Sequence, residues 1–332
     1  MEAGSFTATT SGGRSSLERS SRSRALDPLL RWTLTGLAAL ILILIAFFFI
    51  RLFVEAKPAF DKFGYIGFVF DNNWDVSKEI FGAWPLLVGT IVTSAIALVI
   101  GVPVAIATAL YISELCPRRA RQPLTILVEL LAAVPSVVYG LWGIKVLAPK
   151  LQPAEQWFSD KFSFLPLVGG PVSIPNCFIA GLIMAIMILP IVSAISREVM
   201  ATVPAQDKEA ALALGATRWE MIRIAVLPYS RAGISGAAML GLGRAIGETI
   251  AVTIVIGNAP NVPQSIFSQA YSLAAVIANE FNEAASDPTH RAALIAAGLV
   301  LFVLTLFVNA IARFYVNRAA RGKPTVPLGM SG

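Results

Sequence analysis

The sequence has few charged side chains, only one histidine and only two cysteines. Charged residues make up 14% of its 332 residues and hydrophobic residues 56%, whereas soluble domains carry about 25% charged residues. Two cysteines are too few for a disulfide framework. Cys116, Cys177 and His290 are also too few and too scattered for a zinc site. The composition excludes an ordinary soluble domain and predicts a multi-pass membrane protein.

The chain also lacks the motifs of common enzymes. A nucleotide-binding P-loop requires G-x-x-x-x-G-K-[ST], and the nearest segment, Arg321-Gly-Lys-Pro324, lacks the first glycine and the final hydroxyl. The sequence contains no G-x-S-x-G and no H-E-x-x-H. We therefore expect no catalytic residue, no metal ligand and no cofactor in this chain.

Six apolar stretches have about the 20 residues that a bilayer-spanning helix needs. They are Trp32–Ile50, Trp84–Ile112, residues 121–145, Ile174–Ile195, residues 232–257 and Ala292–Ala312. The third stretch is the shortest and contains Pro135, so its ends are poorly defined. The sequence predicts an all-α membrane protein with six transmembrane helices.

These spans divide the chain into five parts. They are a disordered tail at 1–28, a first transmembrane helix at 29–54, an aromatic outer loop at 55–83, a five-helix core at 84–318, and a C-terminal tail at 319–332. The first tail is rich in serine, threonine, glycine and arginine and cannot bury a core. Aromatic rings favour the membrane–water boundary, so we expect the outer loop to lie along the membrane face. His290 is expected to be solvated in a later outer loop.

The distribution of basic residues predicts the orientation. Most of the 26 lysines and arginines fall in segments 1–31, 113–123, 197–231 and 313–332. Basic residues concentrate on the cytoplasmic side of membrane proteins, so both termini are expected in the cytoplasm. The basic residues do not form one patch, and no nucleic-acid partner is expected.

The loop at 197–231 has the pattern of a helix–turn–helix. Ala205–Leu214 consists of strong helix formers, and Gly215 can end or sharply bend that helix. Thr217 and Glu220 have the spacing of a capping box for a second short helix, which Pro228 is expected to stop. A loop with no function beyond connection would rarely have this length and regularity.

The same loop carries a family resemblance. Glu209-Ala210-Ala211, followed by Gly215 and Leu227-Pro228, resembles the EAA loop of ABC importer permeases. The family prefers isoleucine three residues before the proline, where this chain has Ala225. The resemblance implies that the loop docks on a separate ATPase subunit. The implied coupling residues are Glu209, Ala210, Ala211, Gly215, Ala216, Thr217, Arg218 and Glu220.

Four further segments resemble the phosphate-specific members of that family. They are residues 89–94, 107–114, 134–143 and 241–249. The resemblance covers roughly residues 30–318 and implies the type I importer permease (MetI-like) fold in the bacterial cell membrane, in contact with lipid. It also implies three partners: a second permease, an ATPase dimer that binds ATP and Mg²⁺, and an extracytoplasmic phosphate-binding protein.

The fifth span contains two charges near mid-bilayer, where an unpaired charge is costly. Arg244 and Glu248 are four residues apart and would share one face of a continuous helix. We expect them to face a hydrated anion pathway; the alternative is an ion pair that only locks helices together. Gly243 and Gly247 have the spacing that permits close helix approach. Glu129, nearer the end of its span, is expected to pack or form hydrogen bonds.

The function predicted from the sequence is therefore the membrane subunit of an ATP-driven phosphate importer. Permeases for other oxyanions, such as sulfate or molybdate, remain open because they share the fold. A gradient-driven transporter or channel that uses Arg244 and Glu248 is a second alternative, although we find no internal repeat to favour it. A membrane subunit that senses phosphate without transporting it is a third.

Overall fold

The computed structural model describes residues 21–321, and the chain divides into two compact units with their boundary after Arg51. The long helix α1 (Ser21–Phe63) crosses this boundary. Its portion in the first unit contains the predicted first span. α1 begins inside the predicted tail, at Ser21, and continues into the predicted outer loop. Residues 1–20 and 322–332, which hold most of the two predicted tails, lie outside the described residues.

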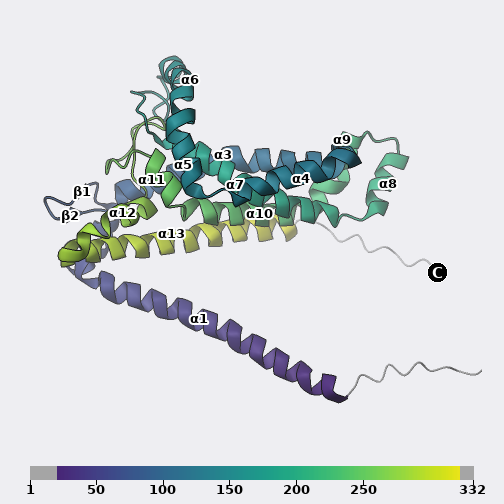
Figure 1. The fold of residues 1–332 in the computed structure, drawn as a ribbon, viewed down its shortest axis with the longest axis horizontal. Helices are drawn as coiled ribbons and strands as arrows, with labels where there is room; N and C mark the ends of the chain where they lie inside the picture. The colour runs from purple at the N-terminus through teal and green to yellow at the C-terminus, as the bar shows by residue number, and fades with distance from the viewer. Residues whose placement is uncertain (1–20, 322–332) are drawn as a thin grey trace, which may run out of the picture. The chain divides into compact units, whose positions relative to one another are not determined.

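The second unit contains a bundle of four long helices that lie side by side (Figure 1). These are α3 (Trp84–Leu110), α7 (Cys177–Ala201), α10 (Leu227–Ile246) and α13 (Pro288–Arg321). Small residues allow α3 and α7 to approach closely. A Cβ added at Gly181 of α7 would lie 2.5 Å from a side-chain carbon of Ile96 on α3, so only glycine permits this contact.

The bundle has two distinct ends (Figure 1). At the end that we call the loop end lie α8 (Ala205–Ala213) and α9 (Arg218–Met221). At the other end, the hairpin end, lie β1 (Trp74–Asp75) and β2 (Ile80–Phe81), which pair antiparallel, together with α12 (Leu273–Glu280). Short helices α2 (Tyr65–Phe70) and η4 (Glu283–Ser286) complete the connections.

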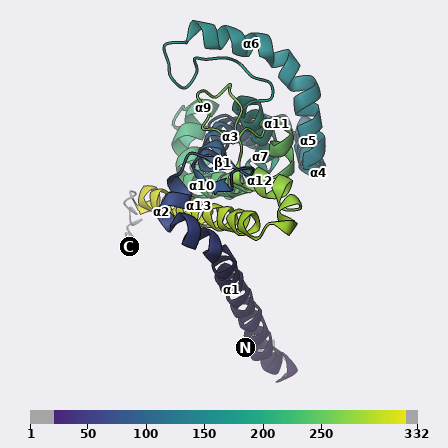
Figure 2. The same ribbon diagram turned by 90° about the vertical axis from the view of Figure 1, so that its left-hand side faces the viewer.

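The region of the predicted third span is sharply bent. Helix α4 (Arg118–Ala133) is followed by α5 (Ser136–Trp142), the π-helix η2 (Gly143–Leu147) and α6 (Ala148–Lys161). The chain turns by 91° at the break before α5, where Pro135 lacks the N–H that a continuous helix requires. Figure 2 shows α6 arching away from the bundle.

The aromatic segment at 55–83 and His290 are placed differently from the prediction. Phe68, Trp74 and Phe81 are buried in a hydrophobic core at the hairpin end, although Tyr65 and Phe70 are exposed. His290 is only 2% exposed, so the expectation of a solvated loop residue is wrong. Its Nε2 lies 3.0 Å from an oxygen of Glu280, and its ring stacks on Phe81. The stacking joins residues far apart in sequence, which no local pattern could indicate.

Among residues 21–321, four helices are long and apolar enough to cross a membrane, or five if the bent α4–α6 region forms one span. The four are Pro28–Phe63, Trp84–Leu115, Cys177–Ala201 and Pro288–Phe314. The predicted fifth span is divided, because α10 ends at Ile246 and α11 (Ile250–Val255) begins after a break. The six-span count therefore stays a prediction.

Candidate coupling and pathway sites

The helix–turn–helix predicted at the loop end is present. Helix α8 ends at Ala213, and Gly215 follows with a φ of 87°, a left-handed conformation that glycine adopts without strain. Thr217 Oγ1 accepts a hydrogen bond from the Glu220 amide, and the Glu220 carboxylate accepts one from the Thr217 amide at 2.8 Å. This reciprocal capping lowers the pKa of Glu220, chiefly through the backbone hydrogen bond from Thr217.

The predicted end of the second helix is wrong. The π-helix η3 (Ile222–Val226) continues α9 directly into α10, and Pro228 lies in the first turn of α10. A proline removes one backbone hydrogen bond from such a continuous helix, and the π-turn of η3 alters the hydrogen-bond pattern directly before it. The loop is therefore continuous with the bundle helix α10.

The loop presents one face outward and one face inward. Most of the residues implied by the EAA resemblance are exposed: Glu209, Ala210, Gly215, Thr217, Arg218 and Glu220. Ala211 and Ala216 are half-buried, and Ala211 packs against a buried cluster that includes Met200 and Ile222.

Several large apolar side chains of the loop are exposed and were missed from the sequence. Around the turn at Gly215, Leu214 is 90% exposed and Trp219 is 59% exposed. Exposed apolar residues beside polar ones indicate a protein interaction surface. The available signal was the presence of a tryptophan and several leucines in a loop otherwise rich in charge and alanine.

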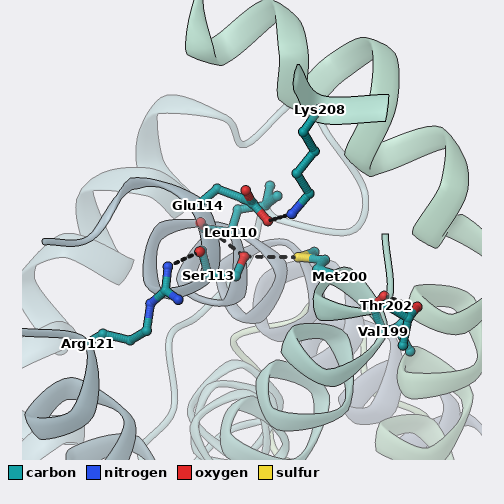
Figure 3. Close-up of polar contacts among 8 residues, drawn as sticks. All are labelled: Leu110, Ser113, Glu114, Arg121, Val199, Met200, Thr202 and Lys208. Carbon is teal, nitrogen blue, oxygen red and sulfur yellow. Dashed lines mark hydrogen bonds and ion pairs between the residues drawn. The ribbon is translucent and has the colours of Figure 1, made fainter. Parts of the chain in front are cut away.

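An ion pair joins the loop to the bundle (Figure 3). Lys208 Nζ of α8 lies 2.6 Å from Glu114 Oε1 in the π-helix η1 (Tyr111–Leu115), which continues α3. The two residues are far apart in sequence, so their pairing could not be read from spacing.

The predicted pathway pair does not share a helical face. Arg244 lies in the last turn of α10, but Gly247 ends that helix and Glu248 falls in the break before α11. Glu248 Oε1 instead accepts a hydrogen bond from the Ala251 amide at 3.5 Å. Within residues 21–321, Arg244 and Glu248 form no ion pair with each other, and Arg244 is exposed. The glycine-rich sequence allowed the helix to break where the length of the apolar stretch predicted continuity.

The other predicted positions have mixed outcomes. A Cβ added at Gly243 would meet nothing within 4 Å, so the close packing predicted for Gly243 and Gly247 is not made within the described chain.

Glu129, expected to pack or form hydrogen bonds, lies 3.1 Å from Arg197 Nη2. The second guanidinium nitrogen of Arg197 donates to Thr125. These two contacts of Arg197 connect α4 with α7.

Comparison with known proteins identifies the family. Residues 101–321 match the family described as "Binding-protein-dependent transport system inner membrane component". The chain belongs to this family. It is 43% identical over 311 residues to the "Phosphate transport system permease protein PstC" of Mesorhizobium japonicum, covering 92% of this chain and 94% of the relative. It is also 43% identical over 289 residues to "PstC 2" of Mycobacterium tuberculosis, covering 85% of this chain and 88% of the relative.

A solved structure supports the same fold. A permease chain of the bacterial alginate ABC transporter, solved in complex with an alginate pentasaccharide-bound periplasmic protein, superposes with a TM-score of 0.59. The match covers 88% of this chain and 96% of that chain at 20% identity. Together with the family match, it confirms the helical MetI-like importer permease fold that the sequence motifs implied.

Proposed function

We propose that this chain is a permease subunit of an ATP-driven inorganic phosphate importer and forms half of its translocation pathway. The observation that supports phosphate as the substrate is the sequence identity to relatives named as phosphate transport permeases. In one case the aligned region covers 92% of this chain. The fold supplies the second argument, since one end of the bundle carries an exposed helix–turn–helix suited to a partner.

The loop end is where the ATPase would dock. Leu214 and Trp219 offer apolar contacts, and Glu209 and Arg218 offer charges on the same exposed loop. ATP and Mg²⁺ would be bound by that partner, a PstB-like ATPase dimer, while this chain supplies only the docking surface. Because η3 is continuous with α10, movement of the loop would reach the bundle directly.

The pathway would run along the exposed face of α10. Leu240 and Arg244 lie one turn apart on that face, and both are exposed. A second, PstA-like permease covering this face would enclose Arg244, whose planar guanidinium can donate several hydrogen bonds to phosphate oxygens. Glu248, at the adjacent break, would weaken anion binding enough to allow release.

The remaining proposals concern location. An extracytoplasmic PstS-like protein would deliver phosphate at the face opposite the ATPase. The basic-residue distribution favours a cytoplasmic position for the loop end and for both termini in a bacterial cell. The bundle itself would be surrounded by membrane lipid.

The decisive experiment is ATP hydrolysis by the reconstituted complex with its binding protein. We expect phosphate to stimulate hydrolysis and sulfate at equal concentration to leave it near the basal rate. Stimulation by sulfate or molybdate in place of phosphate would favour the other oxyanion permeases. Phosphate uptake without ATP, driven by an ion gradient, would contradict the proposal.

A further inference from the structure

The loop end contains a largely shielded ion pair that the family resemblance does not predict, although Glu114 ends one of the resembling segments, 107–114. Lys208 Nζ donates to Glu114 Oε1 at 2.6 Å. The Glu114 side chain is 8% exposed and the Lys208 side chain 21%. Ion pairs on open surfaces contribute little, whereas a pair shielded from water is held more strongly and in a fixed direction. Figure 3 shows Lys208 extending from α8 to meet Glu114.

The backbone around Glu114 has an unusual geometry. Glu114 lies in η1, whose final hydrogen bond runs from the Cys116 amide to the Tyr111 carbonyl at 2.7 Å. A π-turn contains one residue more than an α-turn and is frequent at functional sites. The extra residue shifts the side chains at this end of α3 relative to a continuous α-helix, and Glu114 is turned toward α8.

Two neighbouring helices hold this turn in place. The Arg121 guanidinium of α4 donates to the Ser113 carbonyl, and the Ser113 hydroxyl lies 3.7 Å from the sulfur of Met200 on α7 (Figure 3). Glu114 is therefore carried by a turn that touches α4 and α7 and that continues α3. Movement of Glu114 would be transmitted to α4 and to two bundle helices, α3 and α7.

Apolar contacts also hold the loop against the bundle. A buried cluster beneath the loop consists of Ala109, Leu110, Met200, Val203, Met221 and Ile222, with further residues of η3 and α10. Apolar contacts are non-directional, so they can hold the loop against the bundle while allowing it to slide. The ion pair between Lys208 and Glu114 fixes the direction in which α8 can pull.

We propose that the Glu114–Lys208 ion pair is a second mechanical link, beside the continuous helix from η3 into α10, that transmits movement of α8 to the bundle. The inference rests on the proposed docking of the ATPase at the loop end and adds the residues through which its movement is transmitted. Both are positioning residues, since neither is required to touch ATP or phosphate. Loss of the pair would leave the ATPase docked and active but would reduce the transport achieved for each ATP hydrolysed.

The test uses the full importer reconstituted in vesicles, with phosphate uptake and ATP hydrolysis measured together. Lys208→Met and Glu114→Gln should each lower uptake per ATP by about fivefold or more, while the ATPase still co-purifies. The double variant Glu114→Lys/Lys208→Glu should recover much of the native ratio. Arg119→Met is a matched control, because Arg119 is an exposed cation at the start of α4, outside the pair, and it should keep the native ratio.

The outcomes separate this inference from the proposed function. Native uptake per ATP in both single variants would overturn the link, and so would a swapped variant no better than the singles. If a single variant fails to assemble, Glu114→Asp and Lys208→Arg keep the charges and should give intermediate ratios; native ratios in both would overturn the link. Absence of phosphate-stimulated hydrolysis in the native complex would instead contradict the proposed function.

Discussion

Two charged sites of the molecule, one at the loop end and one at the end of α10, differ in whether the charge is paired. At the loop end, Lys208 and Glu114 are paired and largely shielded from water. At the end of α10, Arg244 is exposed, and no carboxylate pairs with it in the described residues. A paired charge is satisfied and suits a mechanical contact, whereas an unpaired arginine retains its hydrogen-bond donors for an anion. The comparison supports the proposed transmission of movement at the first site and the proposed binding of phosphate at the second.

The largest expected effect comes from removing the unpaired charge. Arg244→Gln should reduce phosphate uptake by at least about tenfold, since hydrogen bonds involving a charged group contribute about 1.5–3 kcal/mol. The complex should still assemble, because Arg244 has no ion pair within the described chain to lose. Phosphate uptake into reconstituted vesicles measures the loss of transport, and co-purification of the ATPase measures assembly.

Two further results would sharpen or break this assignment. Arg244→Lys should restore only part of the uptake, because an ammonium lacks the planar fork of donors. Uptake at the native rate in Arg244→Gln would remove Arg244 from the pathway and leave it a lipid- or partner-facing residue.

The next effect concerns the turn in the loop. Gly215→Val should weaken phosphate-stimulated ATPase activity severalfold, because a β-branched residue at a φ of 87° is strained by roughly 1–2 kcal/mol. The added side chain itself meets nothing within 4 Å in this chain, so the effect would come from backbone strain or from the docked partner. Gly36→Val is the control, since Gly36 on α1 is equally open but has no positive φ.

Glu209→Lys should also weaken the stimulated activity, by reversing a charge on the exposed docking face. The fold of the Glu209→Lys variant should be unaffected, because the Glu209 side chain is exposed. Normal phosphate-stimulated hydrolysis in both Gly215→Val and Glu209→Lys would remove the loop from the mechanism.

The same comparison explains what the sequence could predict. The capping of Thr217 by Glu220 and the turn at Gly215 were predicted correctly, because they depend on residues within a few positions of each other. The continuity of the helix through Arg244 and Glu248 was predicted wrongly. The apolar stretch did not indicate whether a glycine would end the helix, because the effect of a glycine depends on the contacts around it.

Contacts between distant segments were beyond the sequence altogether. The Lys208–Glu114 pair and the burial of His290 against Phe81 each join parts of the chain that only the fold brings together. The family resemblance implied the architecture correctly, but it did not include these pairs.

A smaller effect is expected at Glu248. Glu248→Gln should slow phosphate uptake by roughly threefold and reduce any preference for phosphate over sulfate, because protonated phosphate can donate a hydrogen bond that sulfate at neutral pH cannot. The carboxylate is available for this, since only one of its oxygens has a hydrogen bond, to Ala251, in the described chain. Competition between the two anions in vesicles measures the preference. An unchanged preference would restrict Glu248 to capping α11.

The smallest effect on activity is expected from cysteines introduced to report orientation. Gln206 lies on α8 and Gln264 between α11 and α12, and both side chains are exposed. Gln206→Cys and Gln264→Cys should transport phosphate at the native rate, because neither residue belongs to the ion pair or to the arginine site. The native cysteines are both buried, so an impermeant thiol reagent should report the new ones. The basic-residue distribution predicts that intact cells label at position 264 only, and that opened cells label at both. Labelling of position 206 from outside would place the paired charges on the extracytoplasmic side, away from any ATPase, and would reverse the assignment of the two sites.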